Sequence, residues 1–224
     1  MKLEGYMEVN GVIILKEGLR IGGTKEAVGI GETDNPIIRH PITRKPYLPG
    51  SSIKGKIRSL LEQKYSQHTQ RTGRPCECSE CFICQLFGSG DPRGGKEPTR
   101  LIFRDAPLSK ESEAELQEFL PGSFVEVKTE IAMDRNKGAA QRGALRTQER
   151  IPAGARFDLS FTMRLFEKDD ASRGNYFQKL SEAFEMLEKD YLGGSGTRGY
   201  GHVEIMTPDG KKHLSEYLRD LQKA

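Results

Sequence analysis

The chain has 224 residues, 35% hydrophobic and 30% charged, enough to bury a substantial core, and the simplest expectation is a single domain over 1–224. Its net charge of +3, from 35 Lys and Arg against 32 Asp and Glu, excludes a uniformly basic protein, so any nucleic-acid-binding surface must be local. No stretch approaches the roughly 18 apolar residues of a membrane helix, and the start lacks the apolar core of a signal peptide, so we expect a cytoplasmic protein without a membrane partner.

Hydrophobic periodicity predicts strands and helices in mixed order along the chain. Apolar alternation predicts a strand at 6–17, and many Gly and Pro residues predict a long irregular loop at 21–50. Ser51 or Ser52 is expected to cap a helix that ends near Tyr65. A short strand at 101–105 and a helix from Ser109 to about Leu120 follow.

Strands are also predicted at 125–133, 157–165 and 200–206, and helices at 174–189 and 211–223. Strands interleaved with helices predict an α+β protein, with a ferredoxin-like core as the best match.

All four cysteines lie within one short segment, as Cys76, Cys78, Cys81 and Cys84. In a reducing compartment this cluster favours metal ligation over disulfides, and four thiolates can bind one Zn²⁺. Two cysteines separated by one residue do not easily bind the same ion, so His68 is an alternative ligand to Cys76 or Cys78, and an accidental reduced cluster is the alternative to a metal site. Four protein ligands predict a structural zinc ion in an insertion at about 66–98.

Two glycine-rich motifs match nucleotide-binding loops in spacing but not in context. Gly50-Ser-Ser-Ile-Lys-Gly-Lys56 has the spacing of a P-loop, yet Ile57 follows where a Mg²⁺-binding Ser or Thr is required. Gly194-Ser-Gly-Thr-Arg-Gly199 has the dinucleotide spacing, yet it follows a helix and precedes a strand. Neither motif therefore predicts a nucleotide site.

Both motifs remain candidate sites for RNA phosphates. The first would present the amides of a helix N-terminus beside hydroxyl and cationic side chains, namely Ser51, Ser52, Lys54, Lys56 and Arg58. The second has so little side-chain bulk, around Gly194, Gly196 and Arg198, that a ribose–phosphate chain could approach its amides. An ordinary capped helix and an ordinary turn are the alternatives.

The positive charge is concentrated in segment 134–154. Five Lys and Arg residues against Asp134 and Glu149 give +3, which equals the net charge of the whole chain. A basic hairpin with a slim tip is predicted, in which Arg135 and Arg142 bind phosphates while the tip wedges between bases. A solvated loop without such a role is the alternative.

Asp34 lies in Asp34-Asn-Pro36, within a segment that Pro36 and Pro41 restrict. The sequence Asp-Asn-Pro is typical of a turn. A carboxylate fixed beside RNA could instead bind Mg²⁺ or assist attack of a 2′-hydroxyl on the adjacent phosphodiester. His40 is a rival general acid or base.

Several segments, in order along nearly the whole chain, together resemble one family. They are Gly18-Leu-Arg-Ile-Gly-Gly23, Asp34-Asn-Pro-Ile-Ile-Arg39, Pro41-Ile-Thr43, Leu48-Pro-Gly-Ser-Ser-Ile-Lys-Gly-Lys-Ile-Arg58, Leu86-Phe-Gly88, Leu101-Ile-Phe-Arg-Asp105 and Asp190-Tyr-Leu-Gly-Gly-Ser-Gly-Thr-Arg-Gly-Tyr-Gly201. The chain is similar to the backbone subunits of type III-A CRISPR effectors, the Csm complex, within the RAMP superfamily. The family commonly has His at the position of Arg20, and only some members have a cysteine cluster.

The resemblance implies a modified RRM-type ferredoxin-like core, self-association into a filament on a guide RNA, and contacts with other Csm subunits. Asp34 would be the catalytic residue of an endoribonuclease that cuts guide-paired target RNA at regular intervals with Mg²⁺ or another divalent ion. Segment 134–152 would be a β-hairpin thumb that kinks the guide RNA. A scaffold without catalysis and a stand-alone zinc-dependent nucleic-acid module are the alternative functions.

Overall fold

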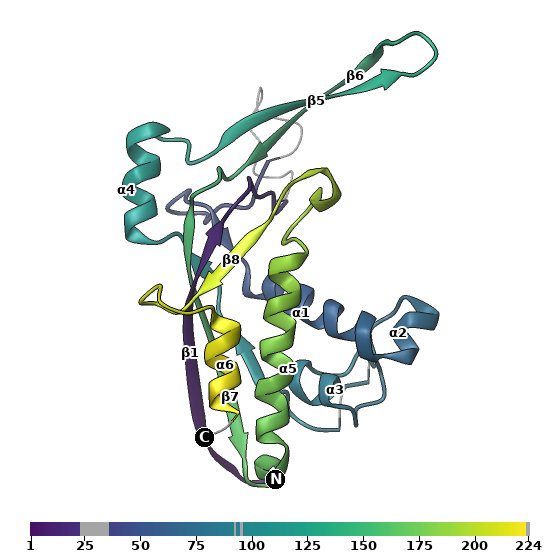
Figure 1. The fold of residues 1–224 in the computed structure, drawn as a ribbon, viewed down its shortest axis with the longest axis vertical. Helices are drawn as coiled ribbons and strands as arrows, with labels where there is room; N and C mark the ends of the chain where they lie inside the picture. Colours follow the sequence, from purple (N-terminus) through teal and green to yellow (C-terminus); the bar gives the residue numbers. More distant parts are fainter. Residues whose placement is uncertain (23–35, 92, 95, 223–224) are drawn as a thin grey trace.

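The computed structural model describes residues 1–22, 36–91, 93–94 and 96–222. Its centre is a four-stranded sheet with the order β3-β7-β1-β8, in which all neighbours are antiparallel (Figure 1). The strands are β1 (Leu3–Leu15), β3 (Leu101–Phe103), β7 (Arg156–Phe166) and β8 (Val203–Met206). The predicted α+β class with antiparallel strands is confirmed.

Two long helices, α1 (Gly50–Tyr65) and α5 (Asp170–Lys189), share one hydrophobic core with the sheet. Alternation along β1 buries Val9 and Ile13 and exposes Glu8 and Asn10, so one face of the sheet carries the core. The ring of Phe161 on β7 stacks on Phe184 of α5, with 5.8 Å between the centroids. The helix α6 (Leu214–Leu221) packs against α5 (Figure 1).

The remaining elements surround this core. A small sheet joins β2 (Tyr47–Leu48) to β4 (Ala106–Pro107), and α4 (Lys110–Phe119) begins after its predicted cap, Ser109. The cysteine segment contains α2 (Gln67–Thr72) and α3 (Phe82–Phe87), neither of which was predicted. Short 3₁₀ turns occupy Glu167–Asp169 and Gly196–Arg198. In the part of the chain that is described, no helix combines the length and the apolar character needed to cross a membrane.

Among the residues that the structure describes, the strands β5 (Glu126–Asp134) and β6 (Ala139–Arg150) pair only with each other, and they project away from the main sheet (Figure 1). The strand predicted at 125–133 is thus one arm of a hairpin, which is longer than the segment expected at 134–152. Val127, Ile131 and Met133 are each more than half exposed. These residues alternate with polar ones as they would in a core strand. Periodicity indicates which face of a strand is apolar, but it does not show whether another element covers that face.

The cap of α1 differs from the prediction. Its N-cap residue is Pro49, not Ser51 or Ser52, and the Gly50 amide donates to Oδ1 of Asp105 at 2.8 Å. A side chain 55 residues away therefore stabilises the helix N-terminus. A Cβ at Gly50 would lie 2.7 Å from the Arg104 carbonyl oxygen, so this approach requires glycine.

Arg100 is fully buried and joins the end of the cysteine segment to the start of α5. It donates from Nε and Nη2 to both carboxylate oxygens of Asp169, at 2.8 and 2.9 Å, and from Nη2 to Glu97 at 2.8 Å. Breaking such a buried pair typically costs about 3–5 kcal/mol, because the remaining charge has no compensation. This pair fixes the cysteine segment relative to the sheet.

Candidate functional site

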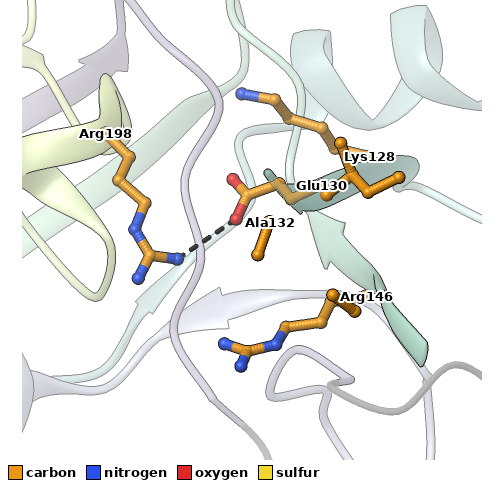
Figure 2. Close-up of a pocket in the computed structure, with 7 residues that line it drawn as sticks. Lys128, Glu130, Ala132, Arg146 and Arg198 are labelled. Carbon is orange, nitrogen blue, oxygen red and sulfur yellow. Dashed lines mark hydrogen bonds and ion pairs between the residues drawn. The ribbon is translucent and has the colours of Figure 1, made fainter. Parts of the chain in front are cut away.

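A groove of about 420 Å³ separates the base of the hairpin from the glycine-rich loop at 193–201 (Figure 2). Three cations and one carboxylate line it, together with small and apolar side chains: Lys128, Glu130, Ile131, Ala132, Ala144, Arg146 and Arg198. The lining charge is +2, which suits an anion such as a phosphate group. The sequence did not indicate Lys128 or Glu130, because only the strand pairing brings residues 128–132 beside 144–148.

Glu130 connects the hairpin to the glycine-rich loop. It accepts hydrogen bonds from the Tyr200 hydroxyl at 2.9 Å, from Arg198 Nη1 at 3.1 Å and from Gln148 Nε2 at 3.1 Å. The hydrogen bond from Tyr200 lowers the pKa of Glu130, burial opposes this shift, and Arg198 reinforces it. Burial and the Glu130 carboxylate raise the pKa of Tyr200. Glu130 is therefore an anion at neutral pH and orients Arg198.

The glycines of this loop serve close contacts inside the protein. At Gly193 (φ 77°) a Cβ would lie 2.3 Å from the Arg20 carbonyl oxygen, and at Gly196 one would lie 1.9 Å from Cγ of Tyr191. Gly194 has more space, with no atom nearer than 3.8 Å to a Cβ, and its amide donates to the Arg20 carbonyl at 2.8 Å. Part of the loop's low bulk is therefore explained by packing against the chain near Arg20.

The predicted cations of α1 divide into two groups. Lys56 lies beside the glycine-rich loop, because its Nζ is 2.9 Å from Asp190 and 3.8 Å from the centroid of Tyr191. Lys54 donates to the Leu101 carbonyl at 3.2 Å, and burial and the nearby Arg58 and Arg164 lower its pKa. Lys56 therefore faces the loop, whereas Lys54 faces β3.

The other predicted contacts are spread over the surface. Ser51 is exposed and Ser52 is half-buried at the start of α1, while Arg58 pairs with Glu62. Arg135 and Arg142 are exposed at the far end of the hairpin. The structure brings Lys56, Gly194, Gly196 and Arg198 together and leaves the hairpin arginines apart.

Asp34 lies outside the described residues, but the chain on both sides of its segment is anchored near the hairpin base. Gly22 forms a bridge with Ile37, and the Ile38 amide donates to the Ile21 carbonyl at 2.9 Å. Oε2 of Glu149, at the end of β6, accepts from the Ile37 amide at 3.0 Å and from Arg39 Nη1 at 2.9 Å.

His40, the rival acid or base, has a local role in the described chain. Its Nδ1 accepts from the amides of Ile42 and Thr43, both at 3.3 Å. The ring therefore stabilises the turn that follows it.

The four cysteine sulfurs converge, with all Sγ atoms within 4.8 Å of one another. The Sγ atoms of Cys76 and Cys78 are 3.6 Å apart, those of Cys76 and Cys81 are 3.8 Å apart, and those of Cys78 and Cys84 are 3.9 Å apart. Four sulfurs at 2.3 Å from a tetrahedral ion would be about 3.8 Å from one another. The cluster fits a metal ion such as zinc, with cysteine at all four positions and without His68.

Backbone amides support this arrangement. The Cys81 amide donates to Sγ of Cys78 at 3.3 Å, and the Cys84 amide donates to Sγ of Cys81 at 3.5 Å. Burial opposes ionisation of Cys78, but amide hydrogen bonds from Glu80 and Cys81 outweigh it and lower its pKa to about 7. Burial raises the pKa of Cys81 to about 11. Metal binding would therefore displace a proton from Cys81.

Comparisons with known proteins agree along nearly the whole chain. The RAMP superfamily profile matches residues 13–204. The chain is 41% identical over 208 residues to "CRISPR system Cms endoribonuclease Csm3" of Methanocaldococcus jannaschii, covering 92% of this chain and 80% of the relative. It is 37% identical over 232 residues to the protein of the same name from Methanothermobacter thermautotrophicus, covering 98% and 91%.

Solved structures show the same similarity. A chain of the Csm3–Csm4 subcomplex of the type III-A CRISPR-Cas interference complex matches with a TM-score of 0.62 and 27% identity, covering 100% of this chain and 98% of that one. A chain of the type III-B Cmr-beta complex bound to cognate target RNA matches with a TM-score of 0.57 and 15% identity, covering 89% and 96%. The second match supports the fold alone.

Proposed function

The chain belongs to the RAMP superfamily and, within it, to the Csm3 endoribonucleases, and we propose that it is a backbone subunit of a type III CRISPR complex that cleaves target RNA. The observation that carries this proposal is the 41% identity to a Csm3 endoribonuclease over 92% of the chain. Membership in this family implies three kinds of partner, namely guide RNA, target RNA and other Csm subunits. It also implies that the protein acts in the cytoplasm.

The groove at the hairpin base supports a role in RNA binding. Arg146, Lys128 and Arg198 give it an excess of positive charge, and Lys56 contacts Tyr191 just before the glycine-rich loop. We assign RNA phosphates to this surface, to the start of α1 and to the hairpin, with the predicted contacts Ser51, Ser52, Lys54, Arg135, Arg142, Gly194 and Gly196. The predicted contact Arg58 is left out, because its guanidinium is bound to Glu62 and to the Cys76 carbonyl. The projecting hairpin corresponds to the thumb in this proposal.

The chain order β1-α1-β3-β7-α5-β8 and the sheet order β3-β7-β1-β8 support a ferredoxin-like core with two β-α-β units. We propose one RAMP domain over 1–224 in which the cysteine segment at about 66–98 is an insertion held by structural Zn²⁺. Cys76, Cys78, Cys81 and Cys84 would hold that ion.

We assign the cleavage chemistry to Asp34. A divalent ion such as Mg²⁺ would supply charge stabilisation for the phosphodiester. Asp34 precedes Pro36 by two residues, and the chain from Ile37 to Arg39 is bound by Glu149 at the hairpin base. This anchoring supports placing the carboxylate near RNA that the groove and the hairpin bind.

The test compares Asp34→Ala and Asp34→Asn with the wild-type chain in the assembled complex, with labelled RNA complementary to the guide and with Mg²⁺. We expect loss of regularly spaced products by about 10²-fold or more with unchanged target binding, since one catalytic proton or charge contact contributes about that much. Asp209→Asn, in an exposed turn at 207–212, is the matched control and should cut normally.

Retained cleavage in both Asp34 variants would contradict the catalytic assignment of Asp34 and favour the alternative function, a guide-RNA scaffold without catalysis. An equal loss of binding and cleavage would show instead that Asp34 shapes its segment.

A further inference from the structure

Glu62 is a buried carboxylate on α1 that RNA binding does not explain. Its Oε1 accepts from Arg58 Nε at 2.8 Å and from the backbone amide of Cys76 at 2.9 Å. Arg58 in turn donates from Nη2 to the carbonyl oxygen of Cys76 at 3.2 Å. Two residues of one helix thus bind the amide and the carbonyl of one cysteine.

Cys76 is one of the two cysteines, with Cys78, whose participation the sequence left open, because a single residue separates them. Its carbonyl also accepts from the Gly90 amide at 2.9 Å and from the Cys84 thiol at 3.3 Å. A metal-bound Cys84 is a thiolate and no longer donates, so Arg58 and Gly90 remain as donors to this carbonyl. Four thiolates and Zn²⁺ carry a net charge of −2, which a nearby guanidinium also stabilises.

We infer that Arg58 and Glu62 form a clamp that positions Cys76 for metal binding, and that Arg58 is a positioning residue of the metal centre and not a phosphate contact. This inference rests on the metal centre proposed above. The side chains of Arg58 and Glu62 are 17% and 5% exposed, so both are already committed to contacts within the protein. Groups that orient metal ligands typically contribute 10- to 100-fold to metal affinity.

The experiment measures Zn²⁺ affinity of the full chain by competition with a chromogenic chelator. We expect Glu62→Ala and Arg58→Ala to weaken Zn²⁺ binding about 10- to 100-fold. Glu62→Gln should fall between wild type and Glu62→Ala, because its amide oxygen still accepts from the Cys76 amide. Arg71 is an exposed residue of α2 that donates to the carbonyl of Gln67, in its own helix, so Arg71→Ala is the matched control and should bind Zn²⁺ normally.

A Co²⁺ titration gives a second readout, since tetrahedral thiolate coordination has its own visible absorption. At saturating Co²⁺ the Arg58→Ala spectrum should match that of wild type, with the midpoint moved to higher metal concentration. If Glu62→Ala does not fold, the metal affinities of Glu62→Gln and Arg58→Lys are compared with that of the wild-type chain instead. Affinities within twofold of wild type in these variants, or a wild-type chain that binds no Zn²⁺, would overturn the inference.

The salt dependence of RNA binding distinguishes a metal-positioning role of Arg58 from a role as a phosphate contact. With the metal site saturated, Arg58→Ala should bind single-stranded RNA with an unchanged salt dependence. A decrease of about 0.7 in the slope of log K against log salt would instead assign Arg58 to a phosphate. The metal measurements need no cleavage assay, so failure of the clamp and failure of the endoribonuclease proposal are distinguishable.

Discussion

Glu130 lies in a groove whose other charged side chains are cationic. It holds Arg198 at 3.1 Å and Tyr200 at 2.9 Å, so it fixes the glycine-rich loop against β5. Lys128 also lies over the ring of Tyr200, with 4.6 Å between Nζ and the centroid. An RNA phosphate that binds Arg198 would compete with Glu130 for the same guanidinium, so this carboxylate sets both the shape of the groove and its affinity for anions.

We predict that Glu130→Ala loosens the hairpin base at neutral pH. The opening free energy of the β5 amides, measured by native-state hydrogen exchange, should fall by about 1–3 kcal/mol, because the buried Tyr200 hydroxyl loses its acceptor. The pKa of Glu130 is depressed in the folded chain, so its contribution is present above the ordinary glutamate value of about 4.3 and is lost as pH falls through the lower folded value.

The difference between Glu130→Ala and wild type should accordingly shrink as the solution is acidified below pH about 4. Glu115→Ala, which removes an exposed partner of Arg156, is the control and should change the exchange of β5 by less than about 0.5 kcal/mol. A difference that is constant with pH would argue against ionised Glu130 as the cause.

At the scale of elements, the apolar side chains of the hairpin remain largely exposed in the described chain. Val127, Ile131, Met133 and Leu145 are 56%, 51%, 54% and 60% exposed, so its apolar residues contribute little to the stability of the core. A two-stranded ribbon is only marginally stable alone. Its base is fixed by Glu130, by the pair of Arg150 with Glu126 at 2.6 Å and by the bridge between Leu19 and Ile151.

We predict that the hairpin can be shortened without loss of the fold. Replacing residues 132–144 by Asn-Gly would join Ile131 to Leu145, which are already cross-strand partners, through a two-residue turn. The free energy of unfolding in urea should change by less than about 0.5 kcal/mol. The slope of log K against log salt for single-stranded RNA should fall by about 1.4, because the two predicted phosphate contacts Arg135 and Arg142 are removed.

The deleted residues carry a net charge of +2, from Arg135, Lys137 and Arg142 less Asp134. A double variant with Gln at Arg71 and Lys211 removes two exposed cations outside the hairpin and is therefore the matched control. An equal decrease of the salt slope in both variants would show that net charge, and not the hairpin, determines RNA binding.

At the scale of the whole molecule, the surfaces that we propose to bind RNA lie on several elements of the described chain, namely the hairpin, the glycine-rich loop and the start of α1. The hairpin projects beyond the core (Figure 1). A subunit of this shape would bind a short stretch of RNA and leave the next stretch for another copy. The family resemblance implies that such copies line up as a filament on guide RNA.

We predict that guide RNAs of increasing length bind increasing numbers of copies, and mass photometry should resolve steps of 25.1 kDa, the mass of one chain. The shortened-hairpin variant should form smaller assemblies on the same RNA, because each copy loses its proposed contacts at Arg135 and Arg142. Large assemblies of the wild-type chain without RNA, unchanged by adding it, would contradict RNA-templated assembly.

The sequence by itself determined the elements whose signal is local. Alternation placed β1 and β7, three- and four-residue spacing placed α5, and Ser109 marked the start of α4, because these patterns depend on neighbours in the chain. Four cysteines in one short segment predicted a cluster that the structure confirms. The ordered motifs predicted the family, which the comparisons confirm.

The tertiary structure decided which distant residues meet. Asp105 caps α1 from 55 residues away, Glu130 binds Tyr200 from 70 residues away, and Glu62 binds the amide of Cys76 across 14 residues. The hairpin arm 126–134 has the alternation of a core strand and yet faces solvent. Local periodicity determines which face of a strand is apolar. Which element packs on that face, and which side chain pairs with a buried charge, depends on the long-range packing that brings distant parts of the chain together.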